Sequence, residues 1–184
     1  MNEYAHLLHT REMDSVTFDR LMKEFGQDVW NYAFFLTRDY HFANDISQEV
    51  FLRVYRNFTS FRGESSIRTW LMKITRNLSL NYRRTAFFRR VRVQSEVDTA
   101  VRARSAEADF LDREVRDEIW RMILKLPAPF REVLVLDIRY DFSLKEIAEL
   151  TGVTEGTVKS RLYRARQKVT AALMESAAER EEPR

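Results

Sequence analysis

The chain contains no cysteine, which excludes a disulfide-stapled fold and any zinc site built on thiolates. No part of the sequence reaches the roughly 18 unbroken apolar residues that a transmembrane helix needs. No basic N-terminal segment precedes an apolar run in the way that predicts a signal peptide. We therefore expect a soluble, cytoplasmic protein with no membrane insertion.

Glycine and proline are also scarce, with 4 Gly and 3 Pro among 184 residues. Apolar residues recur at spacings of three and four rather than alternating, which predicts helices and no strands. The excess of positive charge is small, because 31 Lys and Arg face 28 Asp and Glu for a net charge of +3. An all-α protein is predicted, in which clustering of charge rather than its total identifies a partner surface.

The hydrophobic pattern divides the chain into two regions. Three amphipathic stretches at about 16–36, 42–58 and 66–84 predict one helical domain. Beyond Ala86 the sequence FFRRVRVQSEVDTAVRARSAEAD has no sustained period. Helical order returns near Phe110 in a stretch that Pro127 and Pro129 end, and further helices follow over 129–140 and 143–169. We predict two small helical domains at 14–85 and 110–174, a flexible linker at 86–109 and a disordered tail at 175–184.

The segment SLKEIAELTGVTEGTVKSRLYRARQKV, from Ser143 to Val169, predicts two helices joined by a short turn. Ser143 and Glu146 have the spacing of a capping box. Gly152 is suited to the left-handed position that ends a helix, and Thr154 is suited to cap the next one. These signals together indicate a helix-turn-helix.

The second helix of this segment has an apolar stripe made by Val158, Leu162, Ala165 and Val169. Its opposite face is basic and rich in hydrogen-bonding groups, with Gly156, Ser160, Tyr163, Arg164 and Gln167 flanked by Thr157 and Lys159. Such a helix enters the DNA major groove in helix-turn-helix proteins. The alternative is an amphipathic surface helix with a solvated basic face, but two caps around a glycine turn favour DNA binding.

Two N-terminal motifs carry further information. In HFANDISQEVFLRVYRNF the apolar residues share one helical face, and the opposite face holds Asp45, Gln48, Glu49, Leu52 and Arg56. A leucine among exposed polar groups suggests a protein partner, although a solvated face with one stray leucine is an equally good interpretation.

In FRGESSIRTWLMKITRNLSLNYRR, a loop at 61–66 combines an aromatic, a basic residue, glycine and hydroxyls. The helix after it turns Arg76 and Arg83 away from its apolar face, with Lys73 and Arg84 beside them. Cations near aromatic rings suit single-stranded or melted nucleic acid. For Trp70 itself, burial in the core is the favoured interpretation.

The order and spacing of DISQEVFLRVYRNF, FRGESSIRTWLMKITRN, a variable linker and LPAPFREVLVLDIRYDFSLKEIAELTGVTEGTVKSRLYRARQKV resemble the sigma-70 family. The resemblance is to the small extracytoplasmic-function (ECF) sigma factors, which have only regions two and four. The C-terminal motif alone is also similar to LuxR-type regulators, and the paired N-terminal motifs favour the sigma factor.

The resemblance implies that region two docks on the clamp helices of the beta-prime subunit of core RNA polymerase, with the beta flap as a further contact. The core-binding positions would be Asp45, Gln48, Glu49, Leu52 and Arg56. The residues that capture and hold the minus-10 element would be Phe61, Arg62, Gly63, Glu64, Ser65, Lys73, Arg76, Asn77 and Arg83. Region four would place Glu155, Thr157, Lys159, Ser160, Tyr163 and Arg164 at the minus-35 element.

The resemblance also implies that the linker, with Arg83, Arg84, Arg89, Arg90 and Arg92 near its start, threads through polymerase channels. A plain solubilising linker explains those arginines equally well. An anti-sigma protein that occludes the polymerase-binding surfaces is an expected partner.

An enzyme is not predicted. The three histidines, His6, His9 and His41, form no zinc-binding motif, and the sequence has no glycine-rich phosphate loop. No cofactor or metal is expected. The competing hypothesis is a free-standing LuxR-like helix-turn-helix regulator, which would bind duplex DNA by itself as a dimer.

Overall fold

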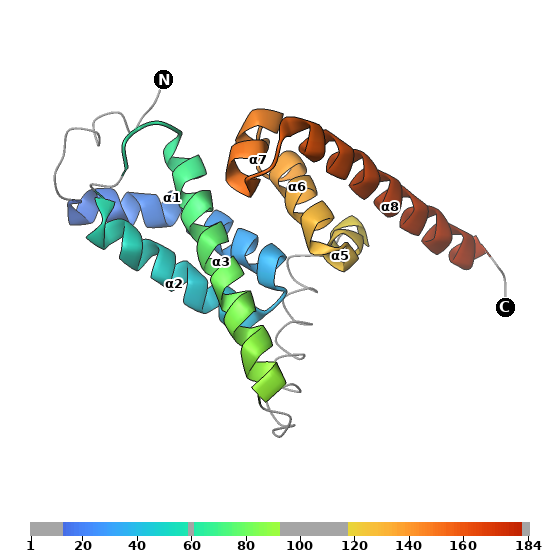
Figure 1. Cartoon of the computed structure of the whole chain (residues 1–184), viewed down its shortest axis with the longest axis horizontal. Coiled ribbons are helices and arrows are strands. Elements are labelled where there is room, and N and C mark those ends of the chain that lie inside the picture. The colour runs from blue at the N-terminus through green and yellow to red at the C-terminus, as the bar shows by residue number, and fades with distance from the viewer. Residues whose placement is uncertain (1–12, 59–60, 93–117, 182–184) are drawn as a thin grey trace. The chain divides into compact units, whose positions relative to one another are not determined.

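The computed structural model describes residues 13–58, 61–92 and 118–181, except for the side chains of 86–92 and 179–181. The chain separates into two compact units, Met1–Thr99 and Ala100–Arg184. Within the described residues every regular element is an α-helix (Figure 1). This confirms the predicted all-α fold class with two helical domains.

The first unit contains α1 (Ser15–Thr37), α2 (Tyr40–Arg56) and α3 (Ile67–Arg92). Each of these helices contacts the other two (Figure 1). Their inward faces supply large, fully buried side chains: Leu21, Val29, Tyr32, Phe34, Ile46, Val50, Leu71 and Met72. Burial of each such apolar side chain contributes about 1.5–3 kcal/mol, so the three helices share one core and leave their outer faces available for partners.

Local capping sets the starts of the first two helices. The Asp14 carboxylate accepts hydrogen bonds from the Thr17 backbone N–H at 2.9 Å and from the Thr17 hydroxyl at 2.6 Å. These bonds lower the pKa of the Asp14 carboxyl. The cap therefore contributes stability at neutral pH and loses it as the pH falls through that lowered pKa. Asp39 caps α2 in the same way by accepting from the Phe42 N–H at 3.0 Å.

The third helix continues to Arg92, whereas the hydrophobic pattern predicted its end at Arg84 and a linker from 86. The intervening segment TAFFRRVR contains neither glycine nor proline, so nothing in it breaks the backbone hydrogen bonding. A repeating pattern of apolar residues indicates that one face of a helix is buried, and it does not report the backbone conformation itself. The pattern can therefore end before the helix does. Residues 93–109 of the predicted linker lie outside the described residues.

The second unit contains α5 (Glu118–Lys125), α6 (Ala128–Ile138), α7 (Leu144–Thr151) and α8 (Glu155–Glu181). The prolines predicted to stop one helix also begin the next, since Pro127 is the N-cap of α6 and Pro129 lies in its first turn. Proline suits that turn because the first helical N–H groups have no intrahelical partner. The long α8 contacts each of the other three helices (Figure 1).

Two interactions secure α5 in this unit. The Arg131 side chain is 4% exposed, and its Nη1 donates to the carbonyls of Leu124 at 3.1 Å and Leu126 at 2.8 Å, which caps the end of α5. The Ser176 hydroxyl on α8 donates to the Glu118 carboxylate at the start of α5.

A disordered tail was predicted at 175–184, whereas α8 continues to Glu181. The added segment ESAAERE is rich in alanine and glutamate, which are strong helix formers. A charged, alanine-rich chain end of this kind can therefore form an exposed helix.

Candidate functional site

The outer face of α2 carries the first group of predicted site residues. Asp45, Gln48 and Arg56 are exposed and Glu49 is half-buried, while the Leu52 side chain is 48% exposed. Their spacings of three and four residues place them on one stripe. The structure therefore brings the predicted α2 residues together on a single surface, opposite the side that enters the core.

This α2 face also holds an aromatic residue that sequence reasoning missed. Tyr55 is 54% exposed and contacts Phe18 of α1 edge-on, with ring centroids 5.2 Å apart. Its position three residues after Leu52 was the available signal. In addition, the Glu49 carboxylate accepts from Arg53 Nε at 2.7 Å, so a paired carboxylate lies beside the apolar Leu52 and Tyr55.

The loop before α3 is anchored by a buried aromatic side chain. Phe61 is 7% exposed, and its ring centroid lies 5.3 Å from that of Trp70 and 6.2 Å from that of Phe58. Phe61 was predicted to contact DNA, but its ring is not exposed to solvent because it packs between these neighbours. Trp70 is half-buried and belongs to the same aromatic cluster, in keeping with the core interpretation.

The rest of this loop has a defined geometry. Gly63 has a φ of 72°, a conformation that glycine adopts without steric cost. Ser66 caps α3, since its Oγ accepts at 3.0 Å from the backbone N–H three residues later. Between these two points Glu64 is exposed and Ser65 is half-buried, and Arg62 just before them is exposed. The loop is therefore fixed at both ends and exposes polar and charged groups between them.

A row of cationic and amide side chains continues along α3 from this loop. Lys73, Asn77, Arg83 and Arg84 are exposed, and Arg76 is half-buried. Their spacing of three, four or seven residues places them on one side of the helix. The predicted minus-10 residues other than Phe61 are thus exposed or half-buried, in the loop and on one side of α3.

The turn between α7 and α8 has the expected capping geometry. The Ser143 Oγ accepts from the Glu146 N–H at 3.3 Å, and the Glu146 carboxylate accepts from the Ser143 N–H at 2.9 Å, which completes the capping box. Gly152 ends α7 with a φ of 70°. Thr154 Oγ1 then accepts from the Thr157 N–H at 3.2 Å at the start of α8. The predicted helix-turn-helix is therefore present.

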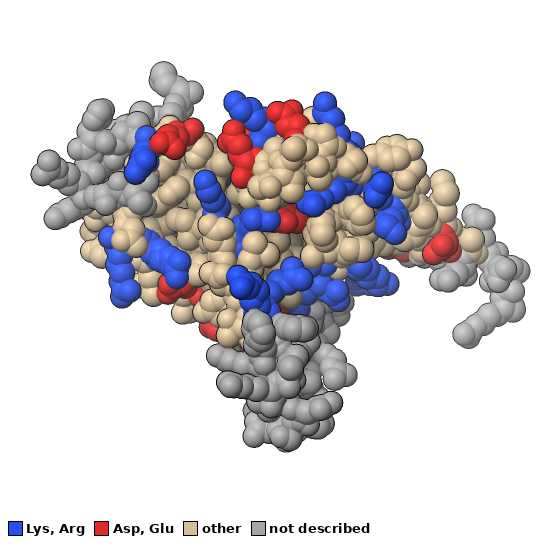
Figure 2. Space-filling model, in the orientation of Figure 1, with Lys and Arg blue, Asp and Glu red and all other residues tan. Residues whose placement is uncertain are grey.

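The two faces of α8 largely follow the prediction. Val158, Leu162 and Ala165 are buried, Val169 at the end of the predicted stripe is half-buried, and the opposite face is exposed. Thr157 is half-buried, and its hydroxyl lies 3.0 Å from that of Thr154. The other predicted residues are exposed: Glu155, Lys159, Ser160, Tyr163 and Arg164. Figure 2 shows Lys and Arg side chains on the visible surface of both units, including the stretch that α8 follows.

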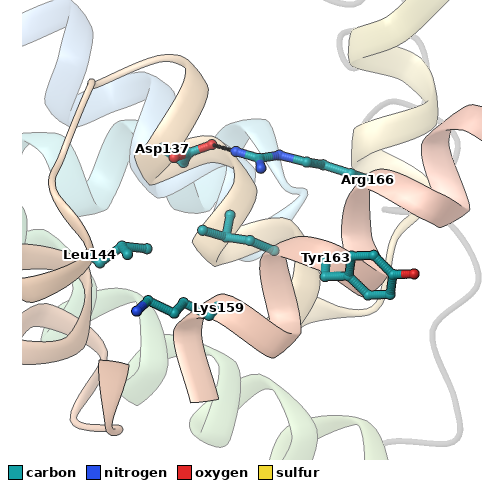
Figure 3. Close-up of a pocket in the computed structure, with 6 residues that line it drawn as sticks. Asp137, Leu144, Lys159, Tyr163 and Arg166 are labelled. Atoms are coloured by element: carbon teal, nitrogen blue, oxygen red, sulfur yellow. Dashed lines mark hydrogen bonds and ion pairs between the residues drawn. The ribbon is translucent and has the colours of Figure 1, made fainter. Parts of the chain in front are cut away.

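An ion pair that sequence reasoning missed lies at the edge of the exposed α8 face. Arg166 of α8 donates through Nη2 to the Asp137 carboxylate of α6 at 2.7 Å (Figure 3). The pair borders a cavity of about 440 Å³ that is lined also by Leu144, Lys159, Leu162 and Tyr163. No local pattern joins Asp137 to Arg166, because only the packing of α6 on α8 brings them together.

Loss of the α7 capping box gives a stability prediction. Ser143→Ala should lower the free energy of unfolding of the second unit by about 1 kcal/mol, because the Glu146 N–H loses its acceptor. Urea unfolding followed by circular dichroism measures this change. Ser160→Ala removes an exposed hydroxyl from a helix interior and serves as the matched control with little expected effect. Equal destabilisation by the two variants would contradict the capping role.

Among residues 13–58, 61–92 and 118–181, no group of three or more His, Cys, Asp and Glu is placed to hold a metal ion. No helix in this part of the chain has the length and apolarity to cross a membrane. His6 and His9 lie outside the described residues, and His41 is exposed on α2.

Two family models match the chain in the regions just described. The model for Sigma-70 region 2 matches residues 21–87, which includes the α2 face, the loop at 61–66 and the α3 row. The model for Sigma-70, region 4 matches residues 116–169, which includes the helix-turn-helix.

Curated relatives match over most of the chain. The RNA polymerase sigma factor YlaC of Bacillus subtilis is 31% identical over 176 residues, covering 95% of this chain and 99% of its own length. The ECF RNA polymerase sigma factor SigM of the same organism is 26% identical and covers 85% of this chain and 94% of its own. The ECF RNA polymerase sigma-E factor of Escherichia coli is 35% identical, covering 68% of this chain and 70% of its own.

Two solved structures are similar in fold. The sigma factor RpoE from Bartonella quintana, in complex with the anti-sigma factor NepR, has a TM-score of 0.64 at 20% identity, covering 85% of this chain and 96% of its own. CnrH, in complex with the cytosolic domain of CnrY, has a TM-score of 0.62 at 22% identity, covering 92% and 93%. With both regions matched in order, the chain belongs to the sigma-70 family and is an ECF RNA polymerase sigma factor.

Proposed function

We propose that this chain binds core RNA polymerase through the α2 face, opens the minus-10 element with the 61–66 loop and α3, and reads the minus-35 element with α8. The observation that carries the proposal is the presence of region two and region four in one chain, each with a separate exposed face of suitable chemistry. In this role the chain is a transcription initiation factor. Because RNA polymerase works in the bacterial cytoplasm, the chain would act there.

The α2 face suits a helical partner such as the beta-prime clamp. Leu52 and Tyr55 supply exposed apolar area, and Asp45 and Gln48 beside them offer groups for hydrogen bonds and charge pairing. Interfaces concentrate their binding free energy in a few such residues at the centre of the contact. We assign Asp45, Gln48, Glu49, Leu52 and Arg56 to this contact, with Tyr55 added at its edge.

The 61–66 loop and α3 suit melted DNA. Extrusion of a base from the stack costs a few kcal/mol, which a pocket must recover through hydrogen bonds and stacking. Arg62 and Glu64 are exposed at the loop, and Lys73, Asn77 and Arg83 follow along α3 to meet the phosphates of the separated strand. Gly63, Ser65 and Arg76 complete the proposed minus-10 surface. Phe61 would contribute indirectly, by packing against the aromatic cluster and so holding the loop in place.

The α8 face suits the major groove. Helix-turn-helix proteins place the N-terminal part of the second helix against base edges, and here that part exposes Glu155, Lys159, Ser160, Tyr163 and Arg164. An arginine can donate two hydrogen bonds to guanine, whereas serine makes shorter, less selective contacts. Thr157 contributes indirectly, because its backbone N–H and hydroxyl complete the cap of α8.

Joining the two DNA-binding units in one chain strengthens their combined binding, since the second contact becomes intramolecular. We assign residues 93–109, which follow the end of α3 at Arg92, to the tether. One of the similar structures is a sigma factor in complex with an anti-sigma factor. By extension, an anti-sigma protein that covers the polymerase-binding surfaces is proposed as a partner of this chain.

Transcription from genomic DNA tests the proposed function. Core polymerase freed of other sigma factors is incubated with genomic DNA of the source bacterium, with and without the chain, and RNA 5′ ends are mapped. We expect new 5′ ends that appear only with the chain and share two upstream motifs. A chain that binds duplex DNA tightly as a dimer, and yields no new 5′ ends with core polymerase, would instead support the LuxR-like regulator.

A glycine substitution tests how closely α8 approaches DNA. At Gly156 an added Cβ meets only Thr154 Oγ1 at 3.9 Å, so Gly156→Ala should stabilise the chain by about 0.5–1 kcal/mol. If the backbone of the α8 start lies against DNA, the same methyl should weaken minus-35 binding. Urea unfolding and promoter-binding titrations measure the two effects.

The matched control is Gly26→Ala in α1, where an added Cβ meets nothing within 4 Å. It should stabilise the chain similarly and leave minus-35 binding unchanged. If Gly156→Ala also left DNA binding unchanged, the start of α8 would not lie close to the DNA backbone or bases.

A further inference from the structure

Arg166 lies at one edge of the proposed DNA-reading face. It follows Lys159 by seven residues, or about two helical turns, so the two side chains share one side of α8. Its side chain is 61% exposed, and an exposed arginine beside a helix in the major groove is within reach of a flanking phosphate. A simple count of basic residues on α8 would therefore include Arg166 among the DNA contacts.

The observed partner of Arg166 is a carboxylate of another helix. Asp137 on α6 accepts from the Arg166 guanidinium at 2.7 Å, and the Asp137 side chain is only 23% exposed. An exposed pair of this kind contributes little to the stability of the fold. Its effect on DNA binding can be larger than its effect on stability, because a phosphate would have to compete with Asp137 for the guanidinium.

We propose that Asp137 is a positioning residue that keeps Arg166 from contacting the DNA backbone. This inference rests on the proposed contact of α8 with the minus-35 element. Phosphate contacts add affinity for any sequence, whereas base contacts by neighbours such as Arg164 carry the selectivity. By holding Arg166, Asp137 therefore removes one phosphate contact from the sequence-independent binding of region four to DNA.

A cavity beside the pair leaves room for the Arg166 side chain to move if it no longer pairs with Asp137. The cavity of about 440 Å³ beside it is lined by Leu144, Lys159, Leu162 and Tyr163 as well as by the pair itself. Asp137, Lys159 and Arg166 are its charged groups, and Figure 3 shows Arg166 extending from α8 to Asp137. Asp137 is thus the single acidic group at this cavity, opposite two cationic ones.

The test measures binding of the complex of core polymerase and the chain to short duplexes between about 50 and 200 mM salt. One duplex carries the minus-35 motif found by genomic transcription, and the other carries the same bases scrambled. Asp137→Asn should raise affinity for both duplexes by the same factor, roughly two- to fivefold at low salt. It should also steepen the slope of log affinity against log salt by about 0.9, the value for one added phosphate contact.

Three further variants separate this mechanism from others. Asp137→Glu should retain the original salt slope, and Arg166→Gln should change affinity little. Asp137→Asn should have no effect in the Arg166→Gln background. If it still raised affinity there, Asp137 would act through its own charge on DNA, and the proposal would be overturned. A large loss of affinity on Arg166→Gln would overturn it as well, since Arg166 would already contact DNA.

The control Arg164→Gln distinguishes failure of this inference from failure of the proposed function. If Arg164→Gln weakens binding to the motif and Asp137→Asn leaves the salt slope unchanged, α8 reads DNA and the role of Asp137 is refuted. If Arg164→Gln leaves binding to the motif unchanged, the assignment of α8 to the minus-35 element fails.

Discussion

Replacing Asp45 and Gln48 together by alanine is expected to weaken binding of the chain to core RNA polymerase by roughly 10- to 100-fold. Both side chains are exposed on α2, so their removal leaves the core of the first unit unchanged. They lie one and two turns before Leu52 on the same face of α2, and Leu52 is 48% exposed. If they are removed, polar groups of the polymerase lose their contact with water on binding and gain no hydrogen bond in exchange. Co-elution on a sizing column, followed by titration with labelled chain, measures the loss.

The matched control for this pair comes from the neighbouring helix. Lys73 and Asn77 are also exposed, on α3, and their joint replacement by alanine should leave polymerase binding intact while impairing opening of the minus-10 element. Equal weakening of polymerase binding by the two double variants would refute the assignment of α2 as the docking face. Unchanged binding of the α2 variant would refute it too.

Arg164→Ala is expected to weaken minus-35-dependent initiation by about 1–3 kcal/mol, the range for loss of one side chain that reads a base pair. Arg164 is exposed on α8, on the side opposite the buried Val158, Leu162 and Ala165. Polymerase binding through α2 should not change, because that contact belongs to the other unit. Transcription yield at limiting promoter concentration, compared with co-elution of the same variant, separates the two effects.

A charge control is needed because any lost arginine lowers the attraction of the chain to DNA. Lys125 is exposed on α5, outside the proposed DNA face, and Lys125→Ala removes the same charge. It should affect initiation much less than Arg164→Ala and show no preference between the motif and a scrambled sequence. If Arg164→Ala lowered polymerase binding as much as initiation, α8 would not be a dedicated DNA reader.

Much of the fold followed from local signals. Ser143, Glu146 and Gly152 predicted the capping box and the end of α7 because caps and left-handed turns depend on residues only a few positions apart. The buried stripe of α8 and the exposed stripe of α2 followed from helical spacing alone. The helix ends at Arg92 and Glu181 were less predictable, because a helix continues wherever nothing breaks it, whether or not one side is buried.

The exposed faces were predicted better than the contacts between helices. Sequence alone determined that this chain is all-α, that α7 and α8 form a helix-turn-helix, and which side of α2 faces solvent, because each depends on neighbours within a turn or two. Only the tertiary structure decided that Phe61 is buried against Trp70 and that Arg166 pairs with Asp137. Those contacts join residues on different elements, and their partners are selected by how the elements pack, which no local period encodes.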